Sequence, residues 1–177
     1  INENFSAHIN NSINGLRIAF SPDLGNIDVD PEIMSIVDQA VKIFVQLGAT
    51  VDIATPSFAN PLEIFNVYWY AAAAQLLNKF NENQKRLIDP GLIDIAAQGA
   101  KIPLMKYLAA TNARIALAEK ANIFHKKWDI LLTPTLPISA FPSGRDIANS
   151  EIQSQWPDWT PFSYPFNLTN QPACSVP

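Results

Sequence analysis

The side chains that most readily do chemistry are few and widely separated in this sequence. The two histidines, His8 and His125, are far apart, so the sequence has no His-x-His or His-x-x-x-His spacing, and Cys174 is the single cysteine. Zinc sites need clusters of such ligands, so we expect no metal site. A cysteine nucleophile needs a nearby base or positive charge. Cys174 instead lies in the small-residue run 173–176, which is typical of a buried strand, so we expect an inert buried thiol.

A serine hydrolase site would need a loop that the sequence does not contain. A nucleophilic serine works beside backbone N–H groups that stabilise the oxyanion, and a Gly- and Ser-rich tract can provide that arrangement. The chain has 6 glycines, none next to another, and one Ser-Gly pair, Ser143-Gly144. The turn after the first apolar run also has no Gly-x-Gly-x-x-Gly pattern for a nucleotide. We therefore predict no catalytic residue and no cofactor in this chain.

Composition excludes several classes of partner. The chain is 48% hydrophobic and 16% charged, with a net charge of −4 and no basic stripe. This favours a globular protein that binds no nucleic acid. The sequence has no apolar run of about 18 residues, so we expect no membrane partner. One cysteine leaves no internal disulfide, and no secretory signal pattern is visible, so we expect a cytoplasmic location.

The elements that must position any site begin with a strand–helix–strand unit. Apolar runs at 16–20 and 50–54 predict parallel neighbouring strands joined by a helix over 31–47. Asp30 is a suitable N-cap for this helix and Gly48 a suitable end. Apolar residues at three- and four-residue spacing predict one stripe facing the core. The stripe consists of Ile33, Ile36, Val37, Ala40, Val41, Phe44 and Leu47.

The rest of the chain predicts one α/β domain with a helical insertion. We expect a flexible N-terminal arm over 1–14 and a single domain over 15–177, with a mixed β-sheet and flanking helices. The insertion covers about 60–127, and proline and glycine breaks divide it into helices near 61–80, 90–99 and 103–127. A buried strand at 130–133 and an irregular stretch anchored by aromatic residues at 145–165 complete the chain.

Five segments, in order, resemble the C-terminal part of the amidase signature family. They are NGLRIAFSPDLG, VDPEI, LGATVD, WDILLTPTLPISAFP and WPDWTPFSYPFNLTNQPACSVP, and together they run from Gly15 to Pro177. The resemblance implies an amidase-signature-type fold of which this chain is the C-terminal part only. It also implies a parent protein that hydrolyses carboxylic amides through an acyl-serine intermediate, with neither cofactor nor metal. The Ser-Ser-Lys triad would lie in a signature region N-terminal to this chain, so we expect the chain alone to be inactive.

The resemblance further implies that this chain supplies scaffold and part of the substrate pocket. The pocket candidates are Trp69, Arg114, Phe141, Asn167 and Gln171. Four of them have a structural alternative: core packing for Trp69, an exposed or ion-paired position for Arg114, and turn capping for Asn167 and Gln171. The expected partners are a small-molecule amide substrate and the N-terminal half of the same protein, and a homo-oligomer is left open.

One residue departs from the family pattern. Asn170 stands where the family usually has glycine, and we expect it to adopt a positive φ, which Asn tolerates best among the other residues. Two other functions stay open at this point. The chain could be a non-catalytic α/β module that binds small molecules, or an inactive amidase-like structural subunit. A sheet separated from its other half should also expose apolar surface.

Overall fold

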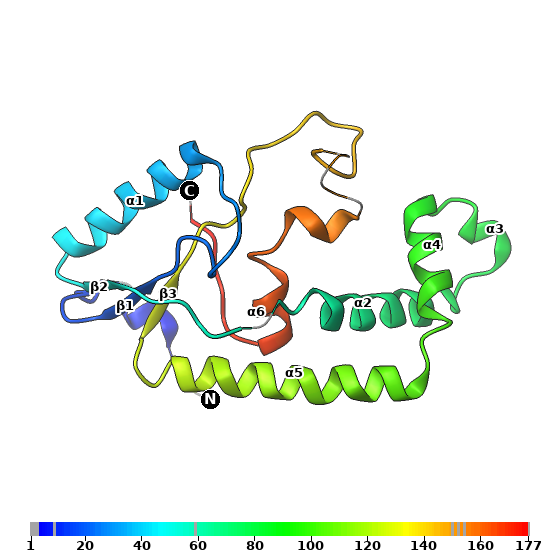
Figure 1. Cartoon of the computed structure of the whole chain (residues 1–177), viewed down its shortest axis with the longest axis horizontal. Coiled ribbons are helices and arrows are strands. Elements are labelled where there is room, and N and C mark those ends of the chain that lie inside the picture. The colour runs from blue at the N-terminus through cyan, green and yellow to red at the C-terminus, as the bar shows by residue number, and fades with distance from the viewer. Residues whose placement is uncertain are drawn as a thin grey trace.

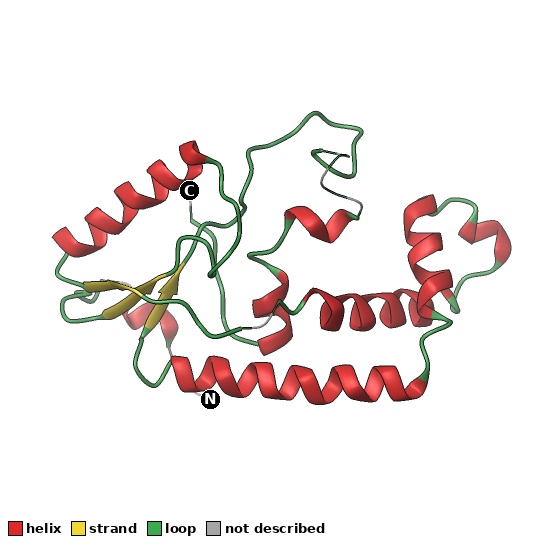
Figure 2. Cartoon of the chain, in the orientation of Figure 1, coloured by secondary structure: helices red, strands yellow, loops and turns green. Residues whose placement is uncertain are grey.

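The computed structural model describes residues 4–8, 10–58, 60–149, 151, 153 and 155–176. Its strands form one parallel sheet in the order β2-β1-β3, made of β1 (Arg17–Phe20), β2 (Thr50–Ile53) and β3 (Ile130–Leu132) (Figures 1 and 2). Ile18 of the central strand pairs with Val51 on one side and with Ile130 on the other. The α/β class is confirmed, and so is the predicted parallel pairing of the first two strands.

The central strand is the most buried part of the sheet. Ile18 and Ala19 have no exposed surface, as expected for a parallel strand with a neighbour on each edge. At the start of the sheet, the backbone N–H and the guanidinium of Arg17 donate to the carboxylate of Asp129, with the shortest contact at 2.7 Å. Hydrogen bonding from the Arg17 side chain, and then from its backbone, lowers the pKa of Asp129 to about 2.

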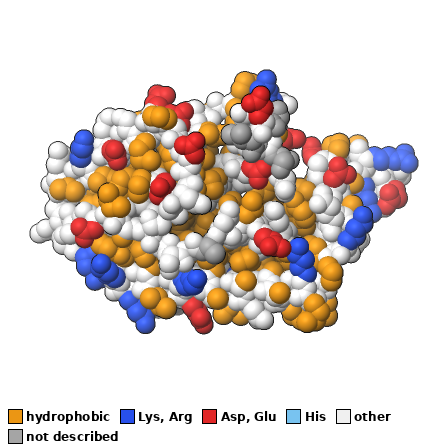
Figure 3. Space-filling model, in the orientation of Figure 1, with side chains coloured by type: hydrophobic (Ala, Val, Ile, Leu, Met, Phe, Trp, Pro, Cys, Tyr) orange, Lys and Arg blue, Asp and Glu red, His pale blue; other side chains and the backbone are white. Residues whose placement is uncertain are grey.

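Helix α1 (Pro31–Gln46) connects β1 to β2, and the Asp30 carboxylate caps it by accepting from the Glu32 N–H at 2.8 Å. The predicted apolar stripe faces the core only in part. Five of its residues are half-buried and no residue of α1 is fully buried; the five are Ile33, Val37, Ala40, Val41 and Phe44. Ile36 is 60% exposed and Leu47, just beyond the helix, 58%. The helix packs against the edge strand β2, and its remaining apolar side chains stay at the surface (Figure 3).

The helical middle has the predicted breaks and one additional helix. The helices are α2 (Leu62–Leu77), α3 (Glu82–Lys85), α4 (Pro90–Gly99) and α5 (Leu104–Phe124). The helix expected over 61–80 ends at Leu77, and α3 begins at Glu82, after the N-cap Asn81, which forms a reciprocal capping box with Gln84. Helix α4 packs on α2 around the buried residues Ala73, Leu77 and Ala96.

The C-terminal segment differs most from the prediction. A 3₁₀-helix η2 (Trp156–Trp159) and a helix α6 (Tyr164–Thr169) form where an irregular stretch and a turn were expected, and 171–176 forms no strand. Tyr164 and Leu168 are both buried one turn apart, and this tertiary packing accounts for such a short helix. The expected arm over 1–14 lies partly outside the described residues, and its described part includes a 3₁₀-helix η1 (Phe5–His8).

Candidate substrate pocket

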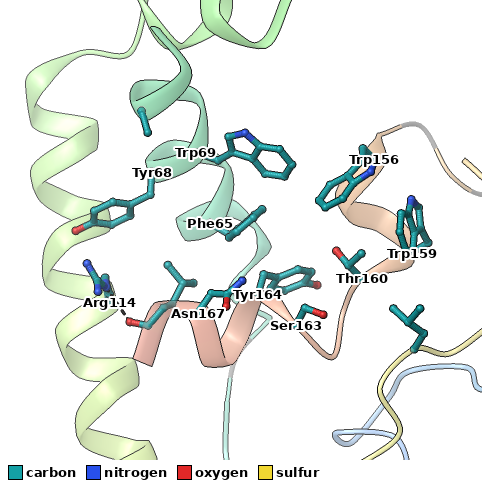
Figure 4. A pocket seen from close by; sticks show the side chains of 13 residues that line it. Phe65, Tyr68, Trp69, Arg114, Trp156, Trp159, Thr160, Ser163, Tyr164 and Asn167 are labelled. Atoms are coloured by element: carbon teal, nitrogen blue, oxygen red, sulfur yellow. Dashed lines mark hydrogen bonds between the residues drawn. The ribbon is translucent and has the colours of Figure 1, made fainter. Parts of the chain in front are cut away.

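A cavity of about 660 Å³ lies where α2, α5, α6 and η2 meet. Leu136, which follows β3, also lines it, so the cavity lies beyond the carboxyl end of a sheet strand, where open α/β proteins bind their ligands. We call it the aromatic cavity, because six aromatic side chains line it. They are Phe65, Tyr68, Trp69, Trp156, Trp159 and Tyr164 (Figure 4).

The aromatic rings contact one another in a continuous series. Phe65 lies between Tyr164 and Trp69, with ring centroids 5.5 Å and 5.1 Å apart, respectively. Trp69 meets Trp156 edge to face at 4.8 Å, and Trp156 meets Trp159 at 5.3 Å. Such edge-to-face contacts stabilise the positions of the rings by more than the burial of their apolar area alone. The series therefore joins α2, η2 and α6 into one apolar wall.

Three polar side chains interrupt this wall on the α6 side. Thr160 Oγ1 donates to the Pro157 carbonyl at 3.0 Å. The side chains of Ser163 and Asn167 have no hydrogen-bond partner among the described residues, although both line the cavity. A hydroxyl and a carboxamide that face an apolar cavity can bind a polar group of a ligand, because each offers both a donor and an acceptor.

Arg114 of α5 holds the end of α6 in place. Its Nε donates to the Leu168 carbonyl at 2.7 Å, its Nη2 donates to Asn170 Oδ1 at 2.9 Å, and its guanidinium carbon lies 5.2 Å from the centroid of the Tyr68 ring. These contacts satisfy a carbonyl that the helix end leaves without an internal partner. Asn170 has φ = 58°, so the positive φ predicted for it is confirmed.

The tyrosines of the cavity are anchored through their hydroxyl groups. Tyr68 Oη donates to Thr111 Oγ1 at 3.0 Å, and Tyr164 Oη donates to Asn60 Oδ1 at 3.3 Å. Burial, and then the charge of Asp158, raises the pKa of Tyr164 above its usual value. The Tyr164 ring therefore contributes a neutral apolar surface near neutral pH.

Of the residues singled out from the sequence, the structure brings Trp69, Arg114 and Asn167 together in this cavity. Phe141 is outside the lining and packs against Trp159, with ring centroids 5.5 Å apart. Gln171 is also outside it, and its Oε1 accepts from Thr169 Oγ1 at 3.2 Å.

Sequence reasoning missed several lining residues, although their spacing carried a signal. The pairs Phe65/Trp69 and Trp156/Trp159 are separated by four and three residues, which places both members of each pair on one side of a helical turn. Ser163 carried no comparable signal in the sequence.

Cys174 requires a correction. It is exposed, and the segment around it lies outside the sheet, because 171–176 pairs with no described strand.

No group of three His, Cys, Asp or Glu side chains in the described part of the chain is arranged to hold a metal ion. None of the helices that the described residues form combines the length and the hydropathy needed to span a bilayer.

Comparison with known proteins identifies the family. The family model described as Amidase matches residues 1–177. The acylamidase of Rhodococcus erythropolis is 34% identical over 174 residues, a match that covers 93% of this chain and 36% of the acylamidase. Among solved structures, 6-aminohexanoate cyclic dimer hydrolase superposes with a TM-score of 0.76 at 18% identity, over 97% of this chain and 40% of that enzyme.

A bacterial aryl acylamidase of the amidase signature enzymes superposes with a TM-score of 0.73 at 20% identity, over 96% of this chain and 38% of that enzyme. The chain therefore spans well under half the length of these relatives. The structural likenesses show that the fold is shared. The family match extends over all 177 residues and agrees with the five motifs, so the chain belongs to the amidase family, whose members include the amidase signature enzymes.

Proposed function

We propose that the full-length protein containing this chain hydrolyses carboxylic amides, and that this chain supplies scaffold and part of the substrate pocket. The observation that carries the proposal is the aromatic cavity, where an apolar wall surrounds two unpaired polar side chains, Ser163 and Asn167. The names of the acylamidase and of the cyclic dimer hydrolase favour the same reaction class.

The proposed reaction follows the chemistry that the family motifs imply. A serine hydroxyl outside this chain adds to the amide carbon, while a lysine outside this chain acts as the general base that takes its proton. The C–N bond then breaks, the amine leaves with a proton, and water hydrolyses the acyl-serine to release the acid. In this scheme the aromatic wall holds the apolar group of the substrate, and Asn167 and Ser163 orient the amide by hydrogen bonding.

The proposed partner of this chain is the remainder of the amidase domain. The apolar side chains of α1 and the exposed edge strand β2 provide a surface for it, since Ile53 is 80% exposed. We also propose a cytoplasmic location, which the single cysteine favours.

A panel of neutral aryl and aliphatic amides tests the proposal. The full-length protein is expected to release amine, and the 177-residue chain alone is expected to release none above background. Trp69→Ala should raise KM more than it lowers kcat, because the indole contacts the substrate in the ground state and in the transition state alike. Leu87→Ala, at a position that is 89% exposed, is the control. Binding without turnover by the full-length protein would favour the inactive-subunit alternative.

A further inference from the structure

A second cavity of about 1070 Å³ adjoins the aromatic cavity. It lies between α4 and the segment that leads into η2, and we call it the polar cavity. Apolar side chains such as Leu92 and Ile95 form part of its lining. Hydrogen-bonding and charged side chains form the rest of the lining that the proposal uses. These are Asp89, Gln98, Arg145, Asp146 and Gln155.

Two tryptophans separate the cavities. Trp69 and Trp156 are the residues that line both, and their rings meet at 4.8 Å with planes 87° apart. Figure 4 shows the two indoles facing each other from α2 and η2. The two indoles are thus the boundary that the cavities share, here called the barrier, and a substitution can change it without breaking a helix.

The barrier is held by a contact beside it. Tyr70 Oη donates to Gln155 Oε1 at 2.7 Å, and this bond ties the start of η2 to α2 one residue away from each tryptophan. Burial, and then Asp158, raises the pKa of Tyr70, so the hydroxyl remains a donor at neutral pH. Gln155 and Asp158 also form a capping box that fixes the first turn of η2.

We propose that the Trp69–Trp156 pair sets the length of substrate that the pocket accepts. This inference rests on the proposed amide hydrolysis. With both indoles present, the apolar group of the amide ends in the aromatic cavity. Without the Trp156 indole the cavities join, and the pocket accepts an amide with a longer chain that ends in a hydrogen-bonding group. The aromatic wall would then hold the apolar part, and the polar cavity would hold the distal group.

Trp156 is the better of the two positions to change. Its side chain is 42% exposed, so truncation removes little core packing. Trp156→Phe retains a ring in the barrier and should behave like the wild type. Trp159→Ala is the matched control, because Trp159 lines the aromatic cavity alone and its loss enlarges that cavity without joining it to the other.

The test compares a short and a long amide in the full-length protein. Acetanilide and 8-hydroxy-N-phenyloctanamide are measured by calorimetric binding, with aniline release followed in parallel. Trp156→Ala should raise the preference for the long amide about tenfold, which needs the burial of only about two more methylene groups. Where aniline is released, the ratio of kcat/KM values replaces the ratio of Kd values.

Two results would overturn the inference: a preference that stays at the wild-type value in Trp156→Ala, or an equal gain in Trp159→Ala. Trp156→Val serves the same purpose if the alanine variant fails to fold. Absence of aniline release with a shifted binding preference would refute the proposed hydrolysis and leave the length determinant standing. Aniline release with an unshifted preference would support the proposed hydrolysis and refute the length determinant.

Discussion

At the residue scale, Arg114 and Asn170 form a pair that the sequence did not suggest. From the sequence, Asn170 is a tolerated replacement for glycine at a positive φ, and Arg114 is a separate pocket candidate. The structure shows the Asn170 carboxamide accepting from the Arg114 guanidinium at 2.9 Å. Asparagine therefore does more than tolerate the turn, because it joins the end of α6 to α5 beside the cavity.

Substitution of Asn170 separates its two roles. Asn170→Gly keeps the left-handed turn and loses the hydrogen bond, so it should change stability by within about 1 kcal/mol. Asn170→Ala loses both and should cost about 1–2 kcal/mol more. Urea unfolding of the full-length protein measures both values. If the Asn170→Ala protein were as stable as the Asn170→Gly protein, the positive φ at this position would carry no cost for alanine, contrary to the expectation.

The Arg17–Asp129 contact predicts a pH dependence of stability. The pKa of Asp129 falls from 3.8 to about 2 in the folded protein. A depressed folded pKa gives stability that is fully present above the unfolded value and is lost as the pH falls through the folded value. The stability gap between wild type and Asp129→Asn should therefore be constant above about pH 5 and narrow from about pH 4 to pH 2.

Thermal unfolding across this pH range measures the gap between the two proteins. In an Arg17→Gln background the same Asp129→Asn change should give a gap with a weaker pH dependence, because the side-chain hydrogen bond, the largest cause of the lowered pKa, is gone while the backbone N–H of residue 17 remains. A gap that persists unchanged at pH 2 would contradict the assignment.

At the scale of elements, the close approach of α4 to α2 positions the barrier between the cavities. Gly99 is buried at the end of α4, and a side chain there would meet the Tyr70 carbonyl of α2. Only glycine permits this contact between backbones. Leu92, Ile95 and Trp69 all pack against the core between the two helices.

Gly99→Ala should therefore destabilise the protein by about 1–3 kcal/mol through overpacking, although alanine is the better helix former. Gly91→Ala, on the same helix, is the control, because the one nearby atom is a carboxylate oxygen of the Asp89 side chain at 3.0 Å, which can move. Calorimetric melting of the two variants compares them. A stable Gly99→Ala protein would show that α4 shifts at no cost.

The elements that could be predicted are those with local signals. Asp30 before Pro31 and Asp89 before Pro90 mark the starts of α1 and α4, and the structure places both helices there. Helix α6 could not be predicted, because it depends on Arg114, 54 residues away from Leu168. The strand expected at 173–176 was wrong because a strand needs a neighbour, which a pattern of small residues does not supply.

The candidate site was predictable only in part for the same reason. The family resemblance made Trp69 and Asn167 pocket candidates, and the structure places both in the aromatic cavity. Trp156 has helical spacing to Trp159, but this spacing does not indicate what the pair faces, and no local pattern indicates Ser163. Residues from four elements meet at this cavity, and only the tertiary packing of these elements brings them together.

At the scale of the whole molecule, the chain exposes more surface than its mass predicts. Its accessible surface is 12052 Å², whereas a folded monomer of 19.5 kDa exposes about 8500 Å². Part of the excess is apolar, with Ile36 60% and Ile43 55% exposed on α1. Figure 3 also shows apolar side chains gathered at the N-terminal end of α5. Such a surface favours contact with the rest of an amidase domain.

The chain alone should therefore self-associate, with a mass by light scattering above 19.5 kDa. Ile36→Glu with Ile43→Glu should reduce this association, since both side chains lie in the exposed apolar surface. The same pair should destabilise the full-length protein, where we expect that surface to be covered.

Ser35→Glu with Gln39→Glu adds the same charge at exposed polar positions of α1 and controls for charge alone. A chain that runs as a clean monomer would contradict the expected covering of α1.

The central claim is that this chain is the pocket-bearing part of an amidase whose nucleophile lies elsewhere in the same protein. Treatment of the full-length protein with a fluorophosphonate, followed by peptide mass spectrometry, tests it most directly. The account predicts an adduct on a serine outside these 177 residues, and no adduct on Ser163 or Cys174. An adduct inside this chain, with loss of amide hydrolysis, would place the nucleophile here and contradict the account.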